Sequence, residues 1–127
     1  MSGKVLVVEN SDALRKLYAD EFANDGYAVT EAADAFAAFE SATQAKPDVI
    51  VLGACTSVAG GSSVQGLEAL GRSLKRLGCR LVVNTGNLSV FGDDRFARIA
   101  DAMVLKSSDL GALKQTLRGL IPDAVAV

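Results

Sequence analysis

Two alternating apolar patterns constrain the fold of this chain more than any other feature of its sequence. Short continuous apolar runs, of which 5–8 and 49–52 are the clearest, are typical of strands buried on both faces. Between these runs, apolar residues recur at the spacing of a helix face. The expected strands are 5–8, 27–30, 49–52, 81–83 and 102–105, and the expected helices are marked by apolar residues at 14–22, 36–39, 64–77, 91–99 and 110–120.

Strict alternation of strand and helix predicts an α/β protein, because right-handed crossovers place a helix between successive parallel strands. We expect a doubly wound, five-stranded parallel sheet in a flavodoxin-like three-layer sandwich. No linker, repeat or low-complexity tract interrupts the 127 residues, which predicts a single domain over 1–127 with its core at about 4–121. Ligands of such sheets bind at the carboxyl ends of the strands, so the residues after each strand are the functional candidates.

Charge and histidine content exclude several kinds of site. The chain has 15 acidic and 13 basic side chains, which disfavours nucleic-acid binding because phosphate neutralisation needs a clustered excess of lysine and arginine. It has no histidine, which excludes Ser-His and Cys-His nucleophiles, imidazole-ligated zinc and a phosphohistidine relay. Cys55 and Cys79 are too few and too far apart for a thiolate metal cage or a CxxC pair, and we expect both to be reduced.

No apolar run is long enough for a membrane span or a signal-peptide core. The first run ends at Glu9, and the longest other run, 49–55, fails the same length test. We therefore expect a soluble cytoplasmic protein with no membrane partner.

Five motifs occur in the order of a known family, four of them at the expected strands and one in the helix expected over 64–77. They are Lys4-Val5-Leu6-Val7-Val8-Glu9-Asn10, Lys46-Pro47-Asp48-Val49-Ile50-Val51-Leu52, Gly66-Leu67-Glu68-Ala69-Leu70, Val83-Asn84-Thr85-Gly86 and Ala100-Asp101-Ala102-Met103-Val104-Leu105-Lys106. With these motifs the chain resembles the receiver domains of two-component response regulators, from Lys4 to about Leu120.

The resemblance implies a phosphorylation pocket at the carboxyl edge of the sheet. In the family, a histidine kinase donates a phosphoryl group to an aspartate after the third strand. Mg²⁺ is held there by that aspartate and an acidic pair, and a hydroxyl and a lysine hold the phosphoryl oxygens. Carried onto this chain, the acidic pair falls on Glu9 and Asn10, the acceptor on Gly53, the hydroxyl on Thr85 and the lysine on Lys106.

Two of these five positions, Asn10 and Gly53, depart from the pattern that the resemblance implies. Gly53 has no side chain, so the acceptor is missing and aspartyl phosphorylation at this position is chemically impossible. Asn10 is neutral, which leaves Glu9 as the only candidate metal ligand, so we expect no metal, no Mg²⁺ or other cofactor, and no enzymatic activity. The family's aromatic switch residue falls on Met103, whose flexible thioether fills space without offering a ring.

The remaining strand-end residues have two interpretations each. Glu9 and Asn10 are either retained ligands or solvated turn residues, with Asn10 or Ser11 capping the first helix. Thr85 is either a retained hydroxyl or the cap of its turn. Lys106 is either a surface cation or, as we prefer, the partner of Glu9 in an ion pair that permanently mimics the charge balance of the family's pocket.

The segment between Gly53 and Gly66 is longer than the family's loop, lacks proline and is rich in glycine and serine. It is either a surface loop or, through Gly60-Gly61-Ser62-Ser63 at a helix start, a cradle for an anion. No lysine follows the glycines, so it is not a Walker A loop. Cys55 in this loop is a weaker candidate for a reactive thiol.

Three functions compete. The leading hypothesis is a pseudo-receiver that cannot be phosphorylated and that contacts signalling proteins, such as a histidine kinase or another response regulator. It includes a possible homodimer through the fourth helix, fifth strand and fifth helix. That surface would carry Asp93, Asp94, Arg95, Arg98, Asp101 and Lys114. The alternatives are a small-anion binding module that uses the Gly-rich loop, and an active protein with a displaced nucleophile such as Thr56, Ser57 or Asp12.

Overall fold

The computed structural model describes residues 3–54, 64–86 and 92–121, without the side chains of 54 and 64–67. Five strands alternate with five helices within this part of the chain. In chain order the elements are β1 (Lys4–Val8), α1 (Asp12–Asn24), β2 (Ala28–Ala32), α2 (Ala35–Ala45), β3 (Val49–Ala54), α3 (Val64–Lys75), β4 (Arg80–Thr85), α5 (Asp94–Ile99), β5 (Ala102–Leu105) and α6 (Gly111–Leu120).

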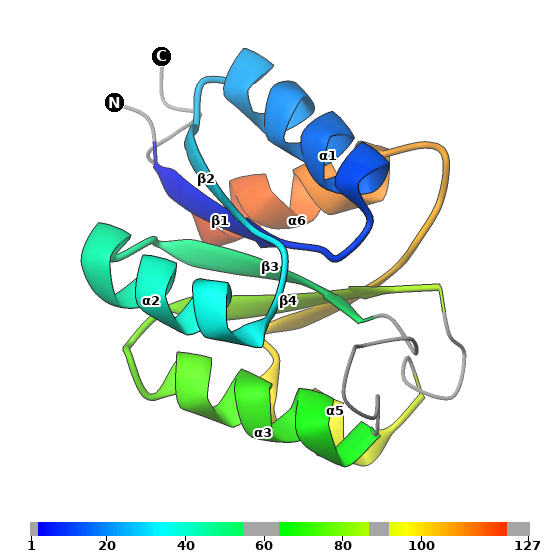
Figure 1. The fold of residues 1–127 in the computed structure, drawn as a ribbon. Helices are drawn as coiled ribbons and strands as arrows, with labels where there is room; N and C mark the ends of the chain where they lie inside the picture. The colour runs from blue at the N-terminus through cyan, green and yellow to red at the C-terminus, as the bar shows by residue number, and fades with distance from the viewer. Residues whose placement is uncertain (1–2, 55–63, 87–91, 122–127) are drawn as a thin grey trace.

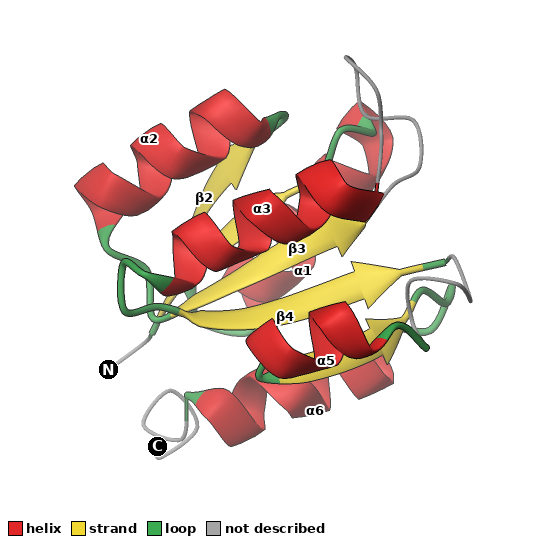
Figure 2. Ribbon diagram, turned by 90° about the horizontal axis from the view of Figure 1, so that it is seen from below, coloured by secondary structure: helices red, strands yellow, loops and turns green. Residues whose placement is uncertain are grey.

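The strands form one parallel sheet in the order β2-β1-β3-β4-β5. Figure 1 shows α1 and α6 on one face of the sheet and α2, α3 and α5 on the other. In Figure 2 all the drawn strand arrows point the same way, so the carboxyl ends of the strands share one edge. The flavodoxin-like doubly wound sandwich that the sequence predicts is thereby confirmed.

Two apolar cores lie on opposite faces of the sheet. On β1, β3 and β4, consecutive side chains alternate between the two faces, and all of them are buried over Val5–Val8, Val49–Leu52 and Leu81–Thr85. One core packs the strands against α2, α3 and α5, and the other packs them against α1 and α6. The continuous apolar runs of the sequence thus reflect burial on both faces.

Local capping signals explain where the first helices begin. The Ser11 side chain accepts a hydrogen bond from the backbone N–H of Leu14 at 3.3 Å, which confirms Ser11 as one of the two expected caps of α1. Asp34 caps α2 in the same way, through the N–H of Ala37 at 2.8 Å. The chain turns between helix and strand at Gly26 and Gly78, which both have positive φ.

The apolar residues that mark α2 in the sequence do not face the core. Phe36 is 78% exposed and Phe39 is 46% exposed, whereas Ala38 and Ala42 are buried against the sheet. Two small side chains let the helix approach the strands closely, and the phenylalanines on the other side of the helix are left outside. The position of the helix is confirmed, but the expectation that its phenylalanines lie on the packed face is wrong.

Cys79 is buried and free, as the sequence suggests, and burial followed by the Asp48 charge raises the pKa of its thiol. Within the described residues, no helix is both long enough and apolar enough to cross a membrane.

We predict that Phe22→Ala lowers the free energy of unfolding by about 3 to 5 kcal/mol, because the fully buried ring leaves a cavity between α1 and the sheet. Phe36→Ala is the matched control and should change it by less than about 0.5 kcal/mol. Urea unfolding of both variants measures the difference. Equal losses would contradict the described packing of α1 and α2.

Candidate functional site

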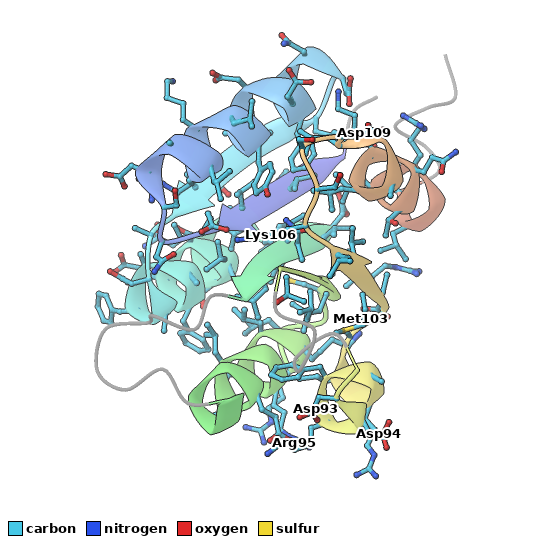
Figure 3. The ribbon with its side chains drawn as sticks, turned by 90° about the vertical axis from the view of Figure 1, so that its right-hand side faces the viewer. Asp93, Asp94, Arg95, Met103, Lys106 and Asp109 are labelled. Atoms are coloured by element: carbon cyan, nitrogen blue, oxygen red, sulfur yellow. The ribbon has the colours of Figure 1, made fainter. Side chains whose placement is uncertain are left out.

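Sheet register brings the expected site residues to one edge. Gly53 pairs with Asn84 and Ala54 with Thr85 along β3 and β4, and the backbone N–H of Lys106 donates to the Thr85 carbonyl at 2.7 Å. Glu9 follows β1 next to Gly53, because β1 and β3 pair up to Val8 and Leu52. Figure 3 looks onto this carboxyl edge and shows Lys106 above the middle of the sheet, with Met103 farther along the same strand toward α5.

The Glu9 carboxylate is buried and bound on both of its oxygens. Lys106 Nζ lies 2.8 Å from Glu9 Oε1, and the backbone N–H of Ser11 donates to Oε2 at 3.1 Å. Glu9 is 2% exposed, and the Lys106 side chain is 20% exposed. The expected Lys106–Glu9 ion pair is thereby confirmed, and it joins groups that are 97 residues apart in the chain.

Gly53 faces this carboxylate at a distance that leaves no room for a side chain. A Cβ atom at position 53 would overlap Glu9 Oε1 and would lie 3.0 Å from the Val8 carbonyl oxygen. The carboxylate of Glu9 therefore occupies the space in which any side chain at position 53 would begin. Because Gly53 has no side chain, position 53 offers no phosphoryl acceptor. The same absence allows the Glu9 carboxylate to reach Lys106.

Arg15 supports the Glu9 segment from α1, a role that the sequence analysis missed. Its Nη1 donates to the Glu9 carbonyl at 2.9 Å and its Nη2 to Asp12 Oδ1 at 2.6 Å, while Nε lies 3.5 Å from Glu31 Oε1. The sequence feature that could have indicated Arg15 is its position one turn into α1, the helix that follows the end of β1. Asp12, a candidate displaced nucleophile, is mostly exposed and paired with this guanidinium.

The other pocket positions differ in burial. Asn10 is exposed and Thr85 is fully buried. Met103 is partly buried and packs on the α2, α3 and α5 side of the sheet, as a space-filling thioether should. Asn84, which the sequence analysis did not single out, is buried next to Gly53, and its Nδ2 has no hydrogen-bond partner among the residues that the structure describes.

The donor set does not fit the Mg²⁺ that the fold family implies. A hard, octahedral cation needs several free oxygen ligands. Gly53 offers none, and both oxygens of Glu9 are already bound to Lys106 and Ser11. No group of three or more acidic or thiol side chains comes together elsewhere in the described segments.

Several candidates lie outside the described residues. These are the anion cradle Gly60-Gly61-Ser62-Ser63, the thiol of Cys55, and the hydroxyls of Thr56 and Ser57. The structure places none of them.

The expected interaction surface over α5, β5 and α6 is largely paired within the chain. Asp101 binds Lys75 Nζ at 2.8 Å, Asp93 binds Arg95 Nη2 at 2.7 Å, and Lys114 Nζ binds Glu21 at 2.7 Å and Asp25 at 3.4 Å. The hydrogen bonds from Arg95 hold the pKa of Asp93 below its usual value.

Asp94 and Arg98 have no ion pair with any described residue, and Leu105 is 43% exposed between the helices. Asp93, Asp94 and Arg95, at the start of α5, lie together at the bottom of Figure 3.

Comparison with solved structures places this geometry in a known fold. The chain superposes on the response regulator protein TrrA from Thermotoga maritima in complex with Mg(2+)-BeF with a TM-score of 0.80, at 21% identity over 94% of this chain and 99% of that one. It has the fold of receiver domains. A CheY-like receiver domain protein from Methanospirillum hungatei gives a TM-score of 0.82 at 16% identity, covering 98% and 97% of the two chains. A LuxR-family two-component response regulator from an Aurantimonas species gives 0.78 at 24% identity, covering 97% and 87%.

No family model matches the sequence, and no curated protein matches it significantly. The chain therefore shares the fold of these receiver domains at a sequence identity of 16% to 24%.

We predict that Gly53→Ala lowers the free energy of unfolding by about 1 to 3 kcal/mol, because the new Cβ displaces the Glu9 carboxylate from Lys106. Gly119→Ala is the matched control: it adds a Cβ into open space on α6 and should stabilise the chain by up to about 1 kcal/mol. Thermal and urea unfolding measure both. A neutral Gly53→Ala variant would contradict the contact with Glu9.

We predict that Lys106→Ala lowers the free energy of unfolding by about 3 kcal/mol, because it leaves the Glu9 carboxylate buried without its cation. The double variant Glu9→Gln/Lys106→Met should recover part of this loss, because no uncompensated charge remains. Unchanged stability of Lys106→Ala would show that the Glu9–Lys106 pair does not stabilise the fold.

Proposed function

We propose that this chain is a receiver-type signalling domain that acts through protein contacts and does not accept a phosphoryl group at position 53. The fold supports the signalling role, since its structural neighbours are response regulator receiver domains. The pocket supports the loss of phosphorylation, because position 53 is a glycine whose side-chain space is filled by the Glu9 carboxylate.

The observation that carries the proposal is the buried Glu9–Lys106 pair. In the family that the chain resembles, the lysine responds to charge that arrives with the phosphoryl group. Here its ammonium already has a carboxylate at 2.8 Å, so the charge balance of the pocket is permanent. A domain with this pocket would hold one signalling state and present it constantly to a partner.

The partner surface of this proposal is formed by α5, β5 and α6. Leu105 is an exposed apolar side chain at its centre, and Asp94 and Arg98 remain available for charged contacts. A histidine kinase, another response regulator or a second copy of this chain would each bind through such a mixed apolar and charged surface. A homodimer would have fewer reciprocal ion pairs than the sequence suggests, because four of the six charged residues are paired internally.

The small-anion alternative is less favoured by the described residues. An anion in the pocket would have to compete with the Glu9 carboxylate for Lys106. Thermal shifts with inorganic phosphate and nucleotides distinguish the two functions.

We predict that incubation with acetyl phosphate and Mg²⁺ adds no phosphoryl mass to the native chain, because no carboxylate is available at position 53. Intact-mass spectrometry measures this directly. The control is Glu9→Asp/Asn10→Asp/Gly53→Asp, which shortens the obstructing side chain and restores three carboxylates next to Thr85 and Lys106. A phosphoryl adduct on the native chain would overturn the proposal.

NMR shift mapping with beryllofluoride and Mg²⁺ provides a second measurement. The native chain should show no change in the amides around Glu9, Gly53 and Thr85. A response of these amides would show that the pocket still binds a phosphoryl analogue.

A further inference from the structure

Asn84 is a buried polar residue in the apolar layer between the sheet and the helices α1 and α6. It follows Val82, a member of the core on that face, by two residues on β4, so its side chain points to the same layer. Asn84 is 1% exposed, and its Nδ2 has no hydrogen-bond partner among the described residues. A buried amide N–H without a partner is unfavourable, because it has given up its hydrogen bonds to water. This donor therefore needs an acceptor.

The carboxylate of Glu9 lies next to this amide. Gly53 is the in-register neighbour of Asn84 on β3, and position 53 faces the same layer, since Val51 two residues earlier belongs to that core. A Cβ atom at position 53 would overlap Glu9 Oε1. Neighbouring strands are about 4.8 Å apart, so the Asn84 side chain begins about one strand spacing from the place that this oxygen fills.

The Lys106 side chain extends across the same place. Lys106 follows β5 and Glu9 follows β1, and β3 and β4 lie between these two strands. Because Lys106 Nζ lies 2.8 Å from Glu9 Oε1, the lysine side chain must pass over the ends of β4 and β3. Those ends carry Asn84 and Gly53. The ammonium, the carboxylate and the amide are thus gathered around Gly53.

The acceptor for the Asn84 amide must fit beside both members of an ion pair. An anion would be repelled by the Glu9 carboxylate, and a cation would be repelled by the Lys106 ammonium and would meet the N–H groups of the amide. Water is neutral, and it can accept from the amide and donate to the carboxylate at the same time. Glu9 can accept this further bond, because each carboxylate oxygen has two lone pairs and the described donors are Lys106 on Oε1 and the Ser11 N–H on Oε2.

We propose that one buried water molecule beside Gly53 accepts a hydrogen bond from Asn84 Nδ2 and donates one to the Glu9 carboxylate. A buried water needs several polar partners, and the amide, the carboxylate and the ammonium supply them. Asn84 then is a positioning residue of the pocket: it holds the Glu9 carboxylate on the side opposite to the Ser11 N–H, and Lys106 is held with it. The inference rests on the proposed function only for the use of this fixed pocket in signalling.

Water-to-amide Overhauser measurements on the ¹⁵N-labelled full chain test the site directly. We expect the side-chain amide protons of Asn84 to show contact with a long-lived water. Gln115 is the matched control, because its side chain is exposed on α6 and should show only rapidly exchanging hydration. The proposal is overturned if the Asn84 amide has no contact with a long-lived water.

Asn84→Leu tests the positioning role, because leucine has a similar size and cannot bind water. We expect Lys106 to react several-fold faster with an amine-reactive ester, as measured at Lys106 by peptide mass spectrometry, since the Glu9 carboxylate has lost one support. Val82→Leu alters an apolar side chain on the same face of β4 and is the matched control, with an unchanged rate.

Two results of the labelling experiment would overturn the positioning role. These are an unchanged rate at Lys106 in Asn84→Leu, and an equal increase in Val82→Leu. A phosphoryl adduct on the native chain, in contrast, would contradict the proposed function and leave the water site of Asn84 standing.

Discussion

Burial of β1, β3 and β4 on both faces is the constraint on which the rest of this structure depends. Each of these strands has a sheet neighbour on both sides and helices above and below, so its middle residues are apolar. Charged side chains on the central strands are consequently confined to the ends, where the chain enters or leaves the sheet. The charged candidate site therefore lies at the carboxyl edge of the sheet, where β1, β3, β4 and β5 end.

At the carboxyl edge, the charge of Glu9 is balanced by Lys106 of the same chain. Glu9 is buried at a large desolvation cost, which Lys106 and the Ser11 N–H offset. The position of the Glu9 carboxylate depends on the absence of a side chain at Gly53. A Cβ atom at position 53 and the carboxylate in its present place would overlap.

Much of the fold and of the candidate site could be predicted from the sequence. The features that could not be predicted have definite physical causes. The order of elements follows from local periodicity, and the Glu9–Lys106 pair follows from the convergence of parallel strand ends. The exposure of Phe36 could not be predicted, because helical spacing does not say which face of α2 meets the sheet. The internal pairing of Asp101 with Lys75 depends on how α3 packs beside α5, and no pattern within either segment indicates that.

The sequence by itself determined the sheet, its edges and the absence of a carboxylate at position 53, because periodicity and residue identity are local properties. Only the tertiary structure decided that Glu9 fills the space in front of Gly53, that Arg15 holds the Glu9 carbonyl, and which charges remain unpaired. Those outcomes depend on distances between segments, which the fold sets and which no local pattern contains.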